Sequence, residues 1–168
     1  MAGHIWTLSP GVQRAIEHSA RTAAAGGVSL AIAEFLRLPA AYWAPITAIV
    51  VMQSTVGAAW TASVQRFAGT LLGAAVGALI TPIFGPNLIA FTMAIFVMGL
   101  LCAVLRIDNP AYRFAGITLA MVMLISPKGP PWQTSLHRAI EVTLGIVVAL
   151  GLTYVWPEPT SNAKPPPR

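Results

Sequence analysis

Two arginines occur in the same local pattern at two places in the sequence. The repeated positions are Trp60, Ser63 and Arg66, and then Trp132, Ser135 and Arg138, always 72 residues apart. A serine at the start of an apolar run predicts a helix N-cap, which puts each arginine in a first helical turn. Because backbone N–H groups at a helix N-terminus and a guanidinium both attract anions, the pattern predicts two anion-binding positions, at Arg66 and at Arg138.

Each arginine also has a structural interpretation. Arg66 suits a positively charged flank that extends from an apolar helix to the membrane surface. Arg138 has Glu141 three residues later, which is the spacing of an ion pair on one helix face.

Other polar side chains stand inside apolar runs. The carboxylates of Glu34 and Glu141 are costly to bury there, and such groups serve either as a proton relay or as partners in an ion pair. The ion-pair partner of Glu34 would be Arg37. Gln53 either lines a path or bonds to a neighbouring helix. Trp43 belongs to an interfacial aromatic belt or stacks on a substrate.

The composition indicates which solvent surrounds these groups. The sequence is 56% hydrophobic and 9% charged, with a mean hydropathy of +0.72, whereas soluble domains carry about 25% charged residues. A water-facing surface cannot be built from so few charges, so lipid must cover much of the chain. The net charge of +5 comes from residues near the ends of apolar runs, which is typical of membrane flanks and not of nucleic-acid binding.

The reactive side chains give no sign of an enzyme. One cysteine, Cys102, and three isolated histidines provide neither a disulfide framework nor a metal-ligand spacing. A phosphate-binding loop and a nucleophile–base motif are also missing from the sequence. We therefore expect no catalysis, no metal and no cofactor.

Six apolar segments follow one another along the chain, at 19–38, 41–58, 63–82, 86–105, 111–126 and 135–156. Crossing a bilayer takes about 20 helical residues, and the breaks between the segments combine proline or glycine with polar residues. The sequence therefore predicts an all-α integral membrane protein with six transmembrane helices. The domain covers 14–157, after a cytoplasmic N-terminal segment (1–13) and before a Pro-rich disordered tail (158–168).

The two arginine patterns belong to a longer repeat, which covers about 14–82 and 86–156. Ile46-Thr47 and Val51-Met52 recur 71 residues later, and Arg37 recurs as Arg106. Three crossings in each copy is an odd number, so the second copy would be inverted relative to the first, as in many transporters. The alternative is an old duplication that serves packing alone.

Glycines and charges extend this interpretation. Gly69, Gly73 and Gly77 lie four residues apart and predict close helix packing, within one chain or across an oligomer interface.

With six crossings, the side that holds both termini carries seven Lys or Arg residues and the other side three. Because cytoplasmic loops are enriched in positive charge, we expect both termini in the cytoplasm.

Three stretches carry a family resemblance. They are Tyr-Trp-Ala-Pro-Ile-Thr-Ala-Ile-Val-Val-Met-Gln at 42–53, Arg-x-x-Gly-Thr-x-x-Gly at 66–73 and His-Arg-Ala-Ile-Glu-Val-Thr-Leu-Gly at 137–145. Over about 14–157 the chain resembles the integral membrane-bound transporter domain of the fusaric acid resistance and aromatic acid exporter superfamily. The resemblance implies a six-helix bundle in the bacterial inner membrane that exports organic, often aromatic, carboxylates.

Plant anion channels for malate are distantly similar, and they use dimers and basic pore residues. By that likeness Arg66, Arg138 and Arg113 are candidates for contact with an anion. Larger members of the superfamily carry a cytoplasmic domain and often a second membrane block, which this sequence lacks. We therefore expect a homo-oligomer, with a dimer favoured.

The expected partners are membrane lipid, a small organic anion and a periplasmic adaptor protein, without nucleic acid. The leading hypothesis is a carrier that exports organic anions. The alternatives are a passive anion channel formed by an oligomer and a non-transporting scaffold or accessory subunit.

Overall fold

Six α-helices make up the described part of the chain. The computed structural model describes residues 9–53, 55–107, 109–125 and 130–157, and no strand occurs among them. The helices are α1 (Pro10–Phe35), α2 (Trp43–Val51), α3 (Val56–Phe84), α4 (Leu88–Val104), α5 (Asn109–Leu124) and α6 (Pro131–Val155). The all-α prediction and its six helices are confirmed, while the predicted tail at 158–168 lies outside the described residues.

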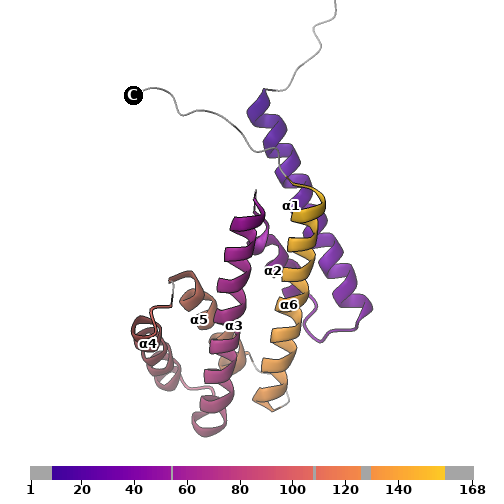
Figure 1. Cartoon of the computed structure of the whole chain (residues 1–168). Helices are drawn as coiled ribbons and strands as arrows, with labels where there is room; N and C mark the ends of the chain where they lie inside the picture. The colour runs from indigo at the N-terminus through magenta and orange to yellow at the C-terminus, as the bar shows by residue number, and fades with distance from the viewer. Residues whose placement is uncertain (1–8, 54, 108, 126–129, 158–168) are drawn as a thin grey trace, which may run out of the picture.

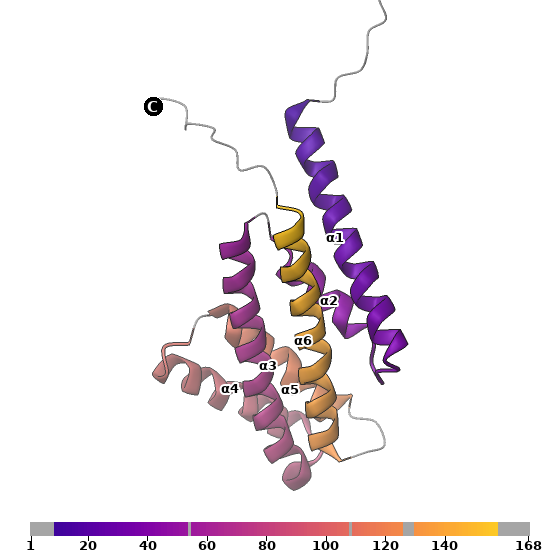
Figure 2. The same ribbon diagram turned by 45° about the vertical axis from the view of Figure 1, so that its right-hand side comes forward.

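Helices α3 and α6 run side by side in opposite directions through the middle of the bundle (Figures 1 and 2). The short helix α2 packs on α6, and α5 packs on α3. Helix α1 lies on the outside next to α2 and α6, and α4 lies on the outside next to α5 and α3. Each outer helix therefore contacts one short inner helix and one long central helix.

The six-span prediction is confirmed in part. Only α3 and α6, among the described helices, combine the length and the hydropathy that a single crossing needs. Helix α4 is apolar but has 17 residues, and it exposes large side chains such as Leu88, Phe96 and Val104. A long apolar surface of this kind is rarely exposed to water, so it is a natural lipid contact.

The prediction of a full second span at 41–58 is wrong. Helix α2 has nine residues, which give about 14 Å of helix against about 30 Å of hydrocarbon. Turns between Leu36 and Tyr42, around Pro39, delay the start of α2, and the extended backbone of Met52 ends it. Four of its residues are buried against the rest of the bundle, while the apolar side chains of Ile46, Ile49 and Val50 are exposed.

The predicted N-caps at Ser63 and Ser135 are wrong as well. Helix α3 begins earlier, where the Thr55 hydroxyl accepts a hydrogen bond from the Ala58 amide at 3.2 Å, and α6 begins directly after Pro130. Ser63 and Ser135 therefore lie inside their helices. Ser63 donates to the Ala59 carbonyl at 2.7 Å, and Ser135 donates across to the Ala74 carbonyl of α3 at 3.2 Å.

Matching glycines set the closest helix contacts. A Cβ on Gly73 of α3 would lie 2.2 Å from the Ala115 carbonyl oxygen of α5. A Cβ on Gly145 of α6 would lie 2.4 Å from the Ala44 carbonyl oxygen of α2. Both glycines thus allow backbone to approach backbone, and the two contacts occupy corresponding positions of the sequence repeat.

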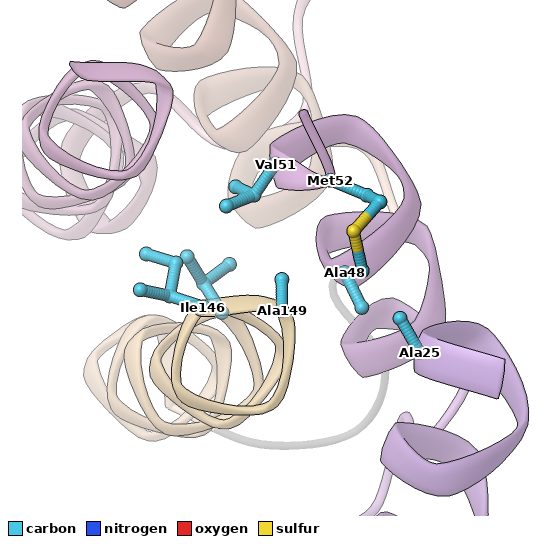
Figure 3. Packing of buried hydrophobic residues seen from close by; sticks show 7 residues of the cluster. Ala25, Ala48, Val51, Met52, Ile146 and Ala149 are labelled. Atoms are coloured by element: carbon cyan, nitrogen blue, oxygen red, sulfur yellow. The ribbon is translucent and has the colours of Figure 1, made fainter. Parts of the chain in front are cut away.

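Corresponding residues are also buried around these contacts. The core between α1, α2 and α6 contains Ala25, Ala48, Val51, Met52, Ile146 and Ala149 (Figure 3). On the other side of the bundle, Leu119, Val122 and Met123 are buried where Ala48, Val51 and Met52 stand in the first copy. The repeat therefore appears in the packing as well as in the sequence.

The ends of α1 and α4 match each other too. Arg37 and Arg106 are the non-glycine residues with positive φ in the described chain, at 53° and 54°. Beyond them, Leu38 donates to the Ala33 carbonyl at 3.0 Å and Ile107 donates to the Cys102 carbonyl at 2.9 Å. This is the Schellman arrangement, in which a left-handed residue terminates a helix.

Candidate functional site

The candidate site centres on an ion pair in the third turn of α6. Nη1 of Arg138 lies 3.2 Å from Oε2 of Glu141, and the two side chains are 7% and 1% exposed. The other carboxylate oxygen, Oε1, accepts a hydrogen bond from the Ala40 amide at 3.0 Å. Glu141 is therefore fixed between its own helix and the connection from α1 to α2.

Trp43, the first residue of α2, covers the guanidinium. The Arg138 Cζ lies 4.3 Å from the centroid of the Trp43 ring, which is a cation–π contact. The Nε and Nη1 atoms of Arg138 are buried without a hydrogen bond that meets geometric criteria, and so is Nε1 of Trp43. Several buried donors at this site therefore lack an acceptor with good hydrogen-bond geometry.

A pocket of about 260 Å³ opens beside these residues. Its walls come from the α1–α2 connection, the start of α2, the end of α5 and the first turns of α6. The lining residues are Pro39, Ala40, Tyr42, Trp43, Met121, Ile125, Gln133, Thr134, His137, Arg138 and Glu141. An aromatic ring, apolar side chains and one guanidinium in a small pocket suit a ligand with an apolar body and a single negative charge.

Arg66 occupies the corresponding place in the first copy of the repeat. Its Cζ lies 4.6 Å from the centroid of the Phe114 ring, and Nη2 makes a long hydrogen bond of 3.4 Å to the Thr47 hydroxyl. Phe114 stands 71 residues after Trp43, so each arginine stacks on the aromatic residue from the opposite copy. None of the described pockets is lined by Arg66, which is 3% exposed.

The Arg138 site contains an acid, Glu141, and the Arg66 site has no acid at the corresponding position. The position that corresponds to Glu141 is Gly69, where a Cβ would lie 2.3 Å from the Ala111 carbonyl oxygen. The position that corresponds to Ala40, whose amide binds Glu141, is Pro110, which has no N–H. Close approach of α5 therefore fills, at Arg66, the space that is open at Arg138.

Charge inside the bundle is unbalanced. Among the described residues, the buried charged side chains are Arg21, Arg66, Arg138 and Glu141. Arg66 lies close enough to Arg138 for the two guanidinium groups to interact electrostatically. One carboxylate for two neighbouring guanidinium groups leaves positive charge in a region of low dielectric, where an anion is bound most strongly.

The remaining sequence-predicted residues lie elsewhere. Arg113 is on the exposed face of α5, one residue before Phe114, and it does not line the pocket. Gln53 lies beyond the end of α2 instead of within it, and it is half-buried. Glu34 and Arg37 are both exposed, and the structure shows no ion pair between these two described residues. Gly69, Gly73 and Gly77 face α5.

Sequence reasoning missed Phe114, Thr47 and the Ala40 amide. Phe114 was detectable, because extending the 71-residue offset back from Ile46 aligns it with Trp43. The Ala40 contact uses a backbone amide, which every residue except proline has, so the sequence could not identify it and only the folded structure shows it. No group of three or more His, Cys, Asp or Glu residues that could hold a metal occurs in the described ranges.

Comparisons with known proteins show that the chain is similar to several bacterial membrane and transporter-named proteins. The inner membrane protein YeeA of Escherichia coli (strain K12) is 29% identical over 147 residues, which are 85% of this chain and 41% of that protein. The inner membrane protein YccS of the same organism is 28% identical over 120 residues, 70% of this chain and 16% of that protein. A Salmonella typhimurium protein named uncharacterized transporter YdhK is 33% identical over 129 residues, 71% of this chain and 19% of that protein.

The chain thus spans less than half the length of these relatives. No solved structure matches it. The family model described as fusaric acid resistance protein-like matches residues 28–152, which is most of the chain. With a match of that extent, this chain belongs to the fusaric acid resistance protein-like family.

Proposed function

We propose that this chain forms the membrane part of a transporter that exports organic anions, aromatic carboxylates among them, across the bacterial inner membrane. One observation carries the proposal: a buried guanidinium with unused donors, Arg138, borders a small pocket walled by Trp43. The guanidinium suits a carboxylate, and the indole suits a ring that stacks beside it. The names of the relatives YccS and YdhK support the inner membrane and transport.

We further propose that the two copies of the repeat are inverted with respect to the membrane. The antiparallel course of α3 and α6 supports this, as do the paired contacts of Arg138 with Trp43 and of Arg66 with Phe114. In this proposal the pocket lies toward the periplasm, on the side opposite both termini. Arg66 lies toward the cytoplasm, on the same path, and its end of the path is closed by α5.

The test is flux of radiolabelled benzoate into proteoliposomes that contain the full chain. We expect saturable flux in wild type and loss of more than about tenfold in Arg138→Gln, because a buried charge-assisted contact is worth about 1.5–3 kcal/mol. Arg14→Gln, which changes an exposed arginine of α1, serves as the matched control. Equal flux in wild type and Arg138→Gln would refute the proposed site.

The same preparation separates the carrier from the alternatives. A passive channel formed by an oligomer would give unitary currents in planar bilayers, with flux that does not saturate. A scaffold or accessory subunit would give neither flux nor current. Cross-linking of the reconstituted protein tests the proposed dimer.

A further inference from the structure

Glu141 and an anionic ligand would compete for the same guanidinium. Oε2 of Glu141 contacts Nη1 of Arg138 at 3.2 Å, but neither atom completes a hydrogen bond of good geometry. The guanidinium has five N–H donors in a planar fork that matches a carboxylate in two-point contact. Glu141 thus occupies the site with a contact that an unattached carboxylate could improve.

We propose that Glu141 holds the place of the substrate carboxylate on Arg138, and that substrate binds when Glu141 takes up a proton and releases the guanidinium. This inference rests on the proposed function. In the exchange, a carboxylate anion and one proton enter from solution. The proton bonds to a Glu141 oxygen, the Glu141–Arg138 ion pair breaks, and a substrate–Arg138 ion pair forms, so the net charge of the site is unchanged.

The geometry supports a protonated Glu141 that stays in place. Its Oε1 accepts the Ala40 amide at 3.0 Å, and a neutral carboxyl group keeps this acceptor. The proton can reside on Oε2, the oxygen that faces Arg138, and from there the hydroxyl can donate to the incoming carboxylate. Protonation therefore releases Arg138 without requiring the Glu141 side chain to leave its anchor.

The surroundings of Glu141 leave few other groups to take this role. His137 and Arg138 lie on its own helix, Tyr42 stands at the start of α2, and Arg66 lies on α3. Met121 of α5 and Ile125, which follows the end of α5, line the pocket without a charge, and among the described residues α1 contributes none of the lining. Glu141 is thus the one carboxylate at the described pocket.

The first copy of the repeat shows what this pair adds. At Arg66 both the acid and its amide anchor are replaced, by Gly69 and by Pro110. The pair of Glu141 and the Ala40 amide is therefore specific to the half of the molecule that contains the pocket.

The experiment is calorimetric titration of the full chain in lipid nanodiscs with benzoate. Titrations run between about pH 6 and pH 8, where a benzoic acid is ionised. Buffers of different ionisation enthalpy report how many protons accompany each bound anion. For wild type we expect uptake of about one proton per benzoate, and an affinity that falls as pH rises, with a limiting slope of about tenfold per pH unit.

Glu141→Gln should bind benzoate without proton uptake and with an affinity that does not depend on pH. The matched control Glu17→Gln, which changes an acid in the first half of α1, should behave as wild type. Wild-type binding without proton uptake would overturn the inference, and so would proton uptake retained in Glu141→Gln. Both outcomes leave the proposed function intact, whereas failure of benzoate to bind the wild type would overturn both. The wild-type proton count needs no variant, so a Glu141→Gln protein that fails to fold does not remove the test.

Discussion

Arg138 and Trp43 come from opposite copies of the sequence repeat and stack on each other, with the guanidinium carbon 4.3 Å from the centroid of the indole ring. Arg66 and Phe114 repeat this relationship at 4.6 Å in the other half of the molecule. Arg138 thus contacts the indole ring and the Glu141 carboxylate, and it borders the pocket. This arrangement makes the ring, as well as the charge, a determinant of binding.

Trp43 can therefore be tested by exchange for the ring of its counterpart. Trp43→Phe keeps an aromatic face under Arg138, and we expect benzoate affinity within about threefold of wild type. Trp43→Leu removes the cation–π contact, worth about 1 kcal/mol at a partly buried site, and should weaken benzoate about fivefold. Titration calorimetry measures both, and equal binding by the Leu and Phe variants would contradict a role for the ring.

The glycine contacts predict a matched effect on stability. Gly73→Ala and Gly145→Ala each place a methyl group within 2.5 Å of a backbone oxygen, and α5 or α2 must move away. We expect each to lower the free energy of unfolding by about 1–3 kcal/mol. Gly116→Ala is the control, because its added methyl meets no atom within 4 Å and alanine favours a helix by about 1 kcal/mol. Thermal unfolding in detergent, followed by circular dichroism, compares the three.

Much of this packing could be read from the sequence, because a duplicated sequence repeats its contacts. The offset of 72 identified Gly73 with Gly145 and Arg66 with Arg138, and the structure gives each pair corresponding neighbours. The helical class also followed from apolar segments of about 20 residues, the length that a helix needs to cross a bilayer. These features depend on local composition and on spacing, which a single sequence records.

The helix boundaries and the acid's anchor could not be read in the same way. The pattern at Ser63 satisfied the rule for an N-cap, but Thr55 provides a competing cap eight residues earlier, and an apolar membrane helix continues through a serine. Helix α2 is short because the turn at Pro39 and the extended Met52 limit it. The Ala40 amide reaches Glu141 across 101 residues of sequence, a contact that only the fold brings together.

The two left-handed arginines allow a test of the caps that end α1 and α4. At Arg37 and Arg106 a Cβ is strained at positive φ, whereas glycine adopts this conformation freely. We expect Arg106→Gly to be more stable than Arg106→Ala by about 1 kcal/mol, because both lose the same charge and only glycine loses the Cβ. Arg37→Gly and Arg37→Ala should differ in stability by the same amount. Chemical unfolding measures it, and an equal stability of the Gly and Ala variants would indicate that these caps open in the membrane.

The proposed inversion predicts that equivalent residues are reached from opposite sides of the membrane. Gln133 lines the pocket and is exposed, and its counterpart 72 residues earlier is Thr61, which is exposed as well. A cysteine at each position, in a chain whose buried Cys102 is replaced by alanine, can be treated with a maleimide that does not cross membranes. In intact cells we expect Gln133→Cys to react and Thr61→Cys to stay unlabelled.

Opening the cells supplies the control for this comparison. Inverted membrane vesicles should reverse the pattern, with Thr61→Cys labelled and Gln133→Cys protected. Because both residues occupy the same position in the sequence repeat and both are exposed, a difference in labelling reports the side of the membrane. Labelling of both cysteines from one side would contradict the proposed inversion with respect to the membrane. Arg66 and Arg138 would then serve one face of the membrane instead of the two ends of a path.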